Sequence, residues 1–78
     1  MSHVPHELHE EFPEAHERLH ALKLSDAHFA RISDRYHEVN RAIHRAEAEV
    51  EPTSDDTLEE MKKQRLALKD EIAGMLSA

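Results

Sequence analysis

The feature that most constrains the fold is an apolar stripe that repeats with a heptad period through the middle of the chain. Seven residues follow one another at alternating spacings of three and four: Phe29, Ile32, Tyr36, Val39, Ile43, Ala46 and Val50. Apolar residues at this spacing lie on one face of an α-helix and pack against a matching face of another helix. The stripe therefore predicts a long helix over residues 25–51, with Ser25 as its N-cap.

A second stripe with the same period follows a short break at residues 52–54. Its members are Leu58, Met61, Arg65, Leu68, Ile72 and Met75, so it includes one basic residue. Pro52 disfavours helical geometry in the residue before it, and Thr53 or Ser54 can cap the next helix over residues 55–76. Because the connection is so short, the two helices must run antiparallel. The predicted fold is all-α, a long antiparallel helical hairpin resembling a coiled coil.

Residues 1–24 are expected to form a shorter helical arm that proline interrupts. Pro5 can begin a first helix, and Pro13 should end it and begin another. Phe29 lies near the end of the partner helix and is left uncovered by it, and the arm, with Leu19 and Leu22, is its natural cover. The arm should therefore dock its apolar face against the hairpin.

Composition restricts the class of protein further. The chain has 78 residues, which allows a single domain over residues 1–78, and it has no cysteine for a disulfide or a thiolate metal site. Its formal net charge of −7 argues against binding to nucleic acid or to an anionic membrane surface. No apolar run has transmembrane length, and the first residues lack a signal-peptide pattern. We therefore expect a cytoplasmic protein that binds neither nucleic acid nor membrane.

The hairpin has two features that its own seam does not explain. Leu66 and Ala73 lie beside the seam, either as scattered exposed apolar residues or as a second contact face for a dimer, a larger bundle or the arm. Arg65 lies on the seam, where it needs water or a polar partner, and Asn40 and Glu47 are its expected neighbours. Alternatively, a seam arginine can select the register or the partner of a coiled coil.

The most conspicuous chemical motif is His16-Glu17-Arg18-Leu19-His20, which matches the H-E-x-x-H motif of zinc hydrolases. With eight histidines and twelve glutamates in the chain, such a match arises easily by chance. No third ligand or substrate cleft is evident, so we expect no enzyme activity, no catalytic residue, no cofactor and no small-molecule substrate. His16 and His20 are weak candidates for metal ligands.

Other histidines leave further interpretations open. The arm also carries His3, His6 and His9, so the alternative function is metal binding or buffering by a histidine-rich arm. The favoured interpretation is that these side chains are solvated. His37 and His44 lie a heptad apart on one flank of the first long helix, where they are either solvated or, at an interface, sensitive to pH.

Several residues resemble those of the YdcH-like family of small bacterial proteins. They are Phe29 with Tyr36, Asn40 with Ile43, and the runs Leu58–Lys63 and Arg65–Ile72. The similarity covers about residues 15 to 76 and implies a helical hairpin with a shorter amino-terminal helical segment in a bacterial cytoplasmic protein. It implies no catalytic or ligand residues, because the family has no established general activity.

These observations lead to one functional hypothesis. We expect a non-enzymatic protein-interaction or assembly module, whose hairpin self-associates or docks on a larger complex. The long seam and the spare face at Leu66 are the reasons for it.

Overall fold

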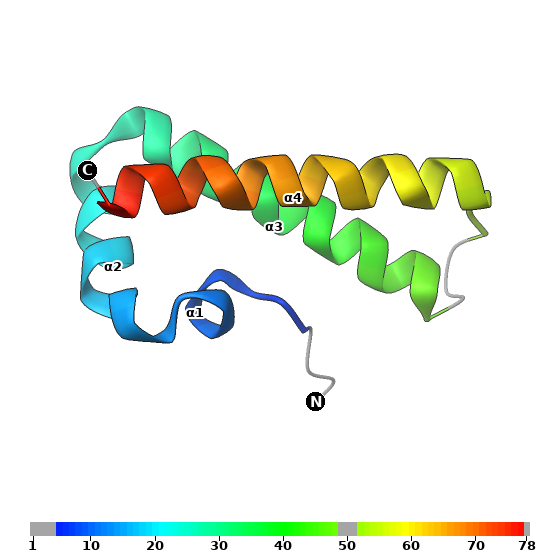
Figure 1. The fold of residues 1–78 in the computed structure, drawn as a ribbon, viewed down its shortest axis with the longest axis horizontal. Helices are drawn as coiled ribbons and strands as arrows, with labels where there is room; N and C mark the ends of the chain where they lie inside the picture. The colour runs from blue at the N-terminus through cyan, green and yellow to red at the C-terminus, as the bar shows by residue number, and fades with distance from the viewer. Residues whose placement is uncertain (1–4, 49–51, 78) are drawn as a thin grey trace.

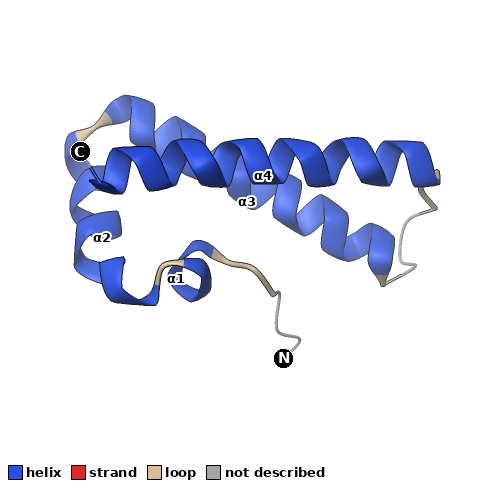
Figure 2. Cartoon of the chain, viewed as in Figure 1, coloured by secondary structure: helices blue, strands red, loops and turns tan. Residues whose placement is uncertain are grey.

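The computed structural model describes residues 5–48 and 52–77, most of which are helical (Figure 1 and Figure 2). In chain order the elements are α1 (Leu8–Glu11), the short 3-10 helix η1 (Pro13–Ala15), α2 (His16–Ser25), α3 (Ala27–Glu47) and α4 (Asp55–Ser77). No strand occurs within the described ranges, so the predicted all-α fold is confirmed. None of the described helices is both long and apolar enough to cross a membrane.

The two long helices form the predicted hairpin. α3 has 21 residues and α4 has 23, so they span about 30 and 35 Å at about 1.5 Å per residue. α4 thus accounts for most of the 37 Å long dimension of the molecule. In Figure 1 the two helices cross at an angle instead of running side by side throughout. The predicted end of the first long helix, residues 49–51 with Val50, lies outside the described residues.

α3 begins at Ala27, and its N-cap is Asp26. The backbone of Asp26 is extended (φ −129°, ψ 106°), and its Oδ1 accepts a hydrogen bond from the Phe29 amide at 3.1 Å. Ser25 is instead the last residue of α2, where its hydroxyl donates to the Ala21 carbonyl at 2.9 Å. The prediction that Ser25 caps this helix is therefore wrong. A carboxylate at this position both accepts the amide and complements the positive end of the helix.

α4 begins at Asp55, where residues 55–76 were predicted to be helical, and its cap is Ser54. The Ser54 hydroxyl oxygen accepts a hydrogen bond from the Thr57 amide at 3.2 Å. Of the two candidate caps, Ser54 makes this contact. The helix continues one residue beyond the predicted end, to Ser77.

The arm is interrupted at proline, as expected. Phe12 leaves helical geometry (φ −129°, ψ 64°), and Pro13 opens η1, which leads directly into α2. α1 begins at Leu8 and not at Pro5, because His6 has a left-handed backbone (φ 63°) that a right-handed helix cannot contain. The arm thus folds as α1 followed, after the break at Pro13, by η1 and α2.

The hydrophobic core lies where the arm meets one end of the hairpin (Figure 1). α1, α2, α3 and α4 all contribute to one buried cluster, which consists of Leu8, Leu19, Phe29, Ile32, Tyr36 and Ile72. Partly buried apolar residues surround it: Phe12, Ala15, Leu22, Leu68, Met75 and Leu76. Phe29 has no exposed surface and belongs to one cluster with Leu8 and Leu19, so the arm covers it, as predicted.

The seam is less completely covered toward the turn. Val39 and Ile43 of α3 are buried, whereas Ala46, Leu58 and Met61 are only half-buried. Figure 1 shows α1 and α2 near the other end of the hairpin. Apolar surface near the turn therefore remains partly open to solvent.

Two exposed ion pairs show the register in which α3 and α4 lie against each other. Lys62 Nζ lies 3.3 Å from Glu47 Oε2, within one helical turn of the register that the two stripes predict. His28 Nε2 lies 3.3 Å from Glu71 Oε2, more than two turns away from that register. A constant register does not hold along the whole hairpin because the helices cross at an angle.

Candidate functional site

A polar contact stands at the middle of the hairpin seam. Arg65 Nη1 donates to Asn40 Oδ1 at 2.9 Å, and Asn40 Nδ2 donates to the Pro5 carbonyl at 2.9 Å. Asn40 is only 1% exposed, so its two hydrogen bonds satisfy a buried amide while joining α3 to α4 and to the arm. Of the two neighbours expected for Arg65, Asn40 makes the contact, and Glu47 pairs with Lys62 instead.

Tyr36 makes a second link to the arm. Its side chain is fully buried, and its hydroxyl donates to the His6 carbonyl at 2.5 Å. Burial raises the pKa of Tyr36 to about 12, and the carboxylates of Glu11 and Glu7 add to this rise against the opposing charge of Arg65. The phenol is therefore neutral at physiological pH and serves as a structural donor.

Glu7 makes the third link, through a carboxylate that is only 11% exposed. Its Oε2 lies 2.7 Å from His37 Nδ1, and its Oε1 lies 3.6 Å from Arg41 Nε. A carboxylate this buried requires such partners, because an unpaired buried charge is costly. His37 therefore lies beneath the arm, and the favoured prediction of a solvated flank is wrong for it. His44, one heptad later, is half-buried.

Glu11 connects the arm to α4. Its Oε1 lies 3.0 Å from His6 Nδ1 and 3.4 Å from Lys69 Nζ. Burial by itself raises the pKa of Glu11, but the hydrogen bond from His6 and the Lys69 ammonium together lower it below the ordinary 4.5. Glu11 is therefore ionised at neutral pH and holds the arm against α4 electrostatically.

The outward side of α4 carries an exposed leucine. Leu66 is 59% exposed and borders a hollow of about 180 Å³ between α4 and the arm, while Ala73 is half-buried two turns later. Lys62 and Asp70 lie one turn to either side of Leu66, and we call these four residues the α4 outer face. Within the described residues, Leu24 of α2 is the other large apolar side chain that is strongly exposed, at 78%.

The H-E-x-x-H motif lies in the first turns of α2. His16, Glu17 and His20 are exposed, whereas Leu19 between them is buried in the core. Across residues 5–48 and 52–77, no three His, Cys, Asp or Glu side chains come together in a way that could hold a metal ion. His3 lies outside the described residues. The described part of the arm thus brings no third ligand to His16 and His20.

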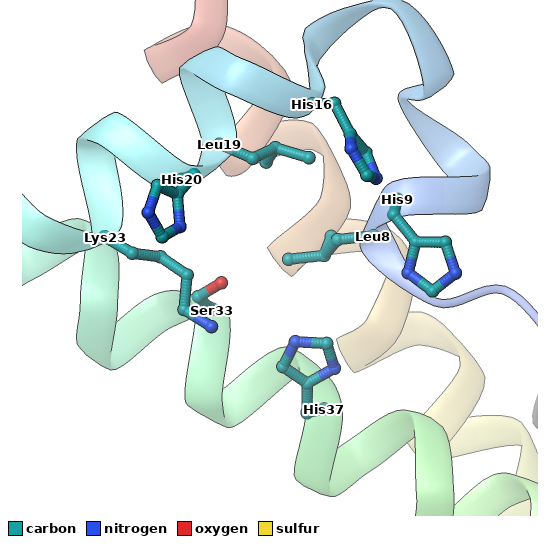
Figure 3. Close-up of a pocket in the computed structure, with 8 residues that line it drawn as sticks. All are labelled: Leu8, His9, His16, Leu19, His20, Lys23, Ser33 and His37. Atoms are coloured by element: carbon teal, nitrogen blue, oxygen red, sulfur yellow. The ribbon is translucent and has the colours of Figure 1, made fainter.

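A pocket of about 350 Å³ lies between the arm and α3, at a place where the sequence suggested no cleft (Figure 3). Its lining residues come from α1, α2 and α3: Leu8, His9, His16, Leu19, His20, Lys23, Ser33 and His37. The rings of His9 and His16 meet edge to face, with their centroids 6.0 Å apart. The rim is exposed, whereas Leu8, Leu19 and Ser33 at the base are buried.

The sequence predicted Asn40 as a neighbour of Arg65 but did not indicate its burial, and it indicated no role for Ser33. Ser33 and Asn40 are fully or almost fully buried, and the Ser33 hydroxyl has no hydrogen-bond partner within the described residues. Ser33, His37, Asn40 and His44 recur at spacings of four, three and four, so they form a polar stripe parallel to the apolar seam. That stripe is the signal that the arm covers a second face of α3. Nothing in the sequence distinguishes Glu7 from the other acidic residues of the arm.

Comparisons with known proteins identify one family. Residues 29–76 match the model of a family described as "Protein of unknown function (DUF465)", so the match covers nearly all of α3 and of α4. No curated protein and no solved structure matches the chain. The match covers more than half of the 78 residues and leaves the arm outside it. The chain therefore belongs to this family of unknown function.

Proposed function

We propose that this protein is a non-enzymatic interaction module whose helical hairpin self-associates, with a second copy of the chain as the partner. The observation that carries the proposal is Leu66, which is 59% exposed in the middle of the α4 outer face. A cytoplasmic setting and the finer YdcH-like resemblance belong to the same proposal. Docking of the same face on a larger complex is the competing outcome.

The α4 outer face is complementary to itself. Lys62 and Asp70 lie four residues before and after Leu66, so an antiparallel contact centred on Leu66 brings Lys62 of each copy to Asp70 of the other. Such a two-fold contact uses the same patch on both copies and forms each ion pair twice. Lys62 pairs with Glu47 at 3.3 Å, and an exposed pair of this kind costs little to exchange.

The surroundings of Leu66 are mostly polar. The hollow of about 180 Å³ beside it is lined chiefly by polar and charged side chains, among them Glu11, Arg65 and Lys69. A contact centred on Leu66 therefore has an apolar centre and a charged margin, as protein interfaces have.

Sedimentation equilibrium over a range of protein concentrations tests the proposal. We expect the wild-type chain to dimerise and Leu66→Glu to shift the equilibrium toward monomer. Removing one buried leucine from each copy forfeits about 3 kcal/mol, which is about a hundredfold in the dissociation constant. Leu24→Glu is the matched control, because it places the same charge on the other strongly exposed leucine.

A charge exchange tests the predicted orientation of the two copies. Lys62→Asp and Asp70→Lys should each weaken association, and the double variant should restore it. The proposal fails if the wild-type chain is monomeric at millimolar concentration. It also fails if Leu24→Glu disrupts association as strongly as Leu66→Glu does. A monomer that requires the α4 outer face to bind a different protein would support docking on a larger complex instead.

A further inference from the structure

We infer that the pocket between the arm and α3 is a binding site for a small organic anion, with anionic oxygens at its rim and a short apolar part at its base. This is the pocket of about 350 Å³ shown in Figure 3, which is lined by α1, α2 and α3. Its volume falls within the range of about 300–1,000 Å³ that small-molecule sites occupy. The inference does not depend on self-association, because none of its lining residues belongs to the α4 outer face.

The distribution of charge around the pocket is unusual for this chain. Acidic residues outnumber lysine and arginine by 17 to 10 in the whole protein, yet no carboxylate is among the residues that line the pocket. The lining instead includes the Lys23 ammonium and four imidazoles, those of His9, His16, His20 and His37. Ammonium groups donate only, and imidazoles donate from both nitrogens once protonated. This set of donors recognises anionic oxygen.

The base of the pocket carries a group that the protein itself leaves without a partner. Ser33 has no exposed surface, and its hydroxyl makes no hydrogen bond within the described residues. An unpaired buried hydroxyl costs free energy that a ligand oxygen can recover. In Figure 3 the Lys23 side chain runs from α2 toward Ser33 on α3, so both groups lie on the same side of the pocket.

His37 is oriented so that one of its ring nitrogens can contact the same ligand. Its Nδ1 lies 2.7 Å from the Glu7 carboxylate, outside the pocket lining, which holds the ring and leaves Nε2 as the nitrogen that can meet a ligand. Beside these polar groups the buried Leu8 and Leu19 form an apolar surface. The combination favours an organic anion over a bare inorganic one, because a short alkyl group can cover the leucines.

Titration followed by NMR of the histidine ring protons tests the inference with two probes, butanoate and inorganic phosphate. The full chain is used at about pH 6, where imidazoles ordinarily carry partial positive charge. We expect butanoate to produce saturable shifts at His20 and His37 and to bind more tightly than phosphate. Binding of phosphate without butanoate would overturn the assignment to an organic anion, and the absence of saturable shifts with either probe would overturn the site.

Three variants distinguish a built site from general attraction of anions. Lys23→Gln should weaken butanoate binding by about tenfold, as expected for loss of a charge-assisted contact. Ser33→Ala should weaken binding while leaving the thermal midpoint of the free protein equal or higher, because it removes an unpaired buried hydroxyl. His44→Gln lies outside the pocket and should bind as the wild type does. Equal weakening in His44→Gln, or unchanged binding in Ser33→Ala, would contradict the inference.

Discussion

Replacing Asn40 with leucine should destabilise the fold by about 2 kcal/mol, although a leucine has nearly the same volume and is more apolar. Asn40 is 1% exposed and makes two hydrogen bonds of 2.9 Å, one from Arg65 and one to the Pro5 carbonyl. A neutral hydrogen bond contributes about 1 kcal/mol and one to a charged group about 1.5–3 kcal/mol. We take the lower value for Arg65, which is only half-buried and can reach water, and the greater burial of leucine offsets part of the loss.

This loss is large for a chain of this size. Native proteins are stabilised by about 0.05–0.15 kcal/mol per residue, so about 2 kcal/mol is a substantial fraction of the total for 78 residues. It corresponds to a fall of about 10 °C in the thermal midpoint. Urea unfolding followed by far-ultraviolet circular dichroism measures the difference, with the slope of the transition checked for constancy.

Two further variants locate the cause of the Asn40 effect. Asn40→Asp keeps an acceptor for Arg65 but loses the donor to Pro5, so it should separate the arm contact from the seam contact. Gln64→Leu replaces an exposed amide on α4 and should change stability by less than about 0.5 kcal/mol. An Asn40→Leu protein as stable as the wild type would refute the reasoning, because the two hydrogen bonds of Asn40 would then make no net contribution to the free energy of unfolding.

Three other contacts give predictions with their own measurements. Tyr36→Phe should cost about 1 kcal/mol in urea unfolding. It should also abolish a loss of stability that the wild type shows as the pH rises from about 10 to about 12, because the contribution of a raised folded pKa is complete below the unfolded pKa and is lost as the pH rises through the folded pKa. Glu11→Gln should remove a contribution that is complete above the ordinary pKa of 4.5 and is lost as the pH falls through the lower folded pKa; parallel acid unfolding curves for variant and wild type would contradict this. Asp26→Ala should cost about 1 kcal/mol by removing the N-cap of α3, whereas Ser25→Ala should cost less in the same assay.

The hairpin was predictable because the apolar positions that define each helix face recur many times along the sequence. Each stripe has many apolar positions, so a single exception such as Arg65 does not obscure the period. Pro52 and the capping residues after it then determine where the chain reverses. The crossing of the helices was not predictable from the stripes, because an unbroken heptad period predicts one constant register along the hairpin.

The docking of the arm was predictable only in part. Leu19 and Phe29 indicated that an apolar face of the arm covers the end of the hairpin, and the structure places both in the core. The polar contacts were hidden because Asn40 and Tyr36 bind backbone carbonyls, which every residue possesses. The left-handed backbone of His6 likewise has no signature in a residue that is not glycine.

The pocket was hidden for a related reason. Its four histidines come from three different helices, so their proximity depends on tertiary structure and not on spacing within one helix. The H-E-x-x-H motif drew attention to His16 and His20 as a metal pair. The structure instead places them with Lys23 and Ser33 around one pocket.

Cross-linking through a single cysteine tests the central claim, self-association through the α4 outer face, most directly. The chain has no cysteine, so Leu66→Cys introduces the only thiol, and Leu24→Cys provides the matched control. A disulfide requires Cα atoms within about 7 Å, which a two-fold contact centred on residue 66 brings about and chance collisions do not maintain. The account predicts rapid formation of a disulfide-linked dimer by Leu66→Cys under mild oxidation and slow formation by Leu24→Cys. Equal rates for the two variants would contradict it.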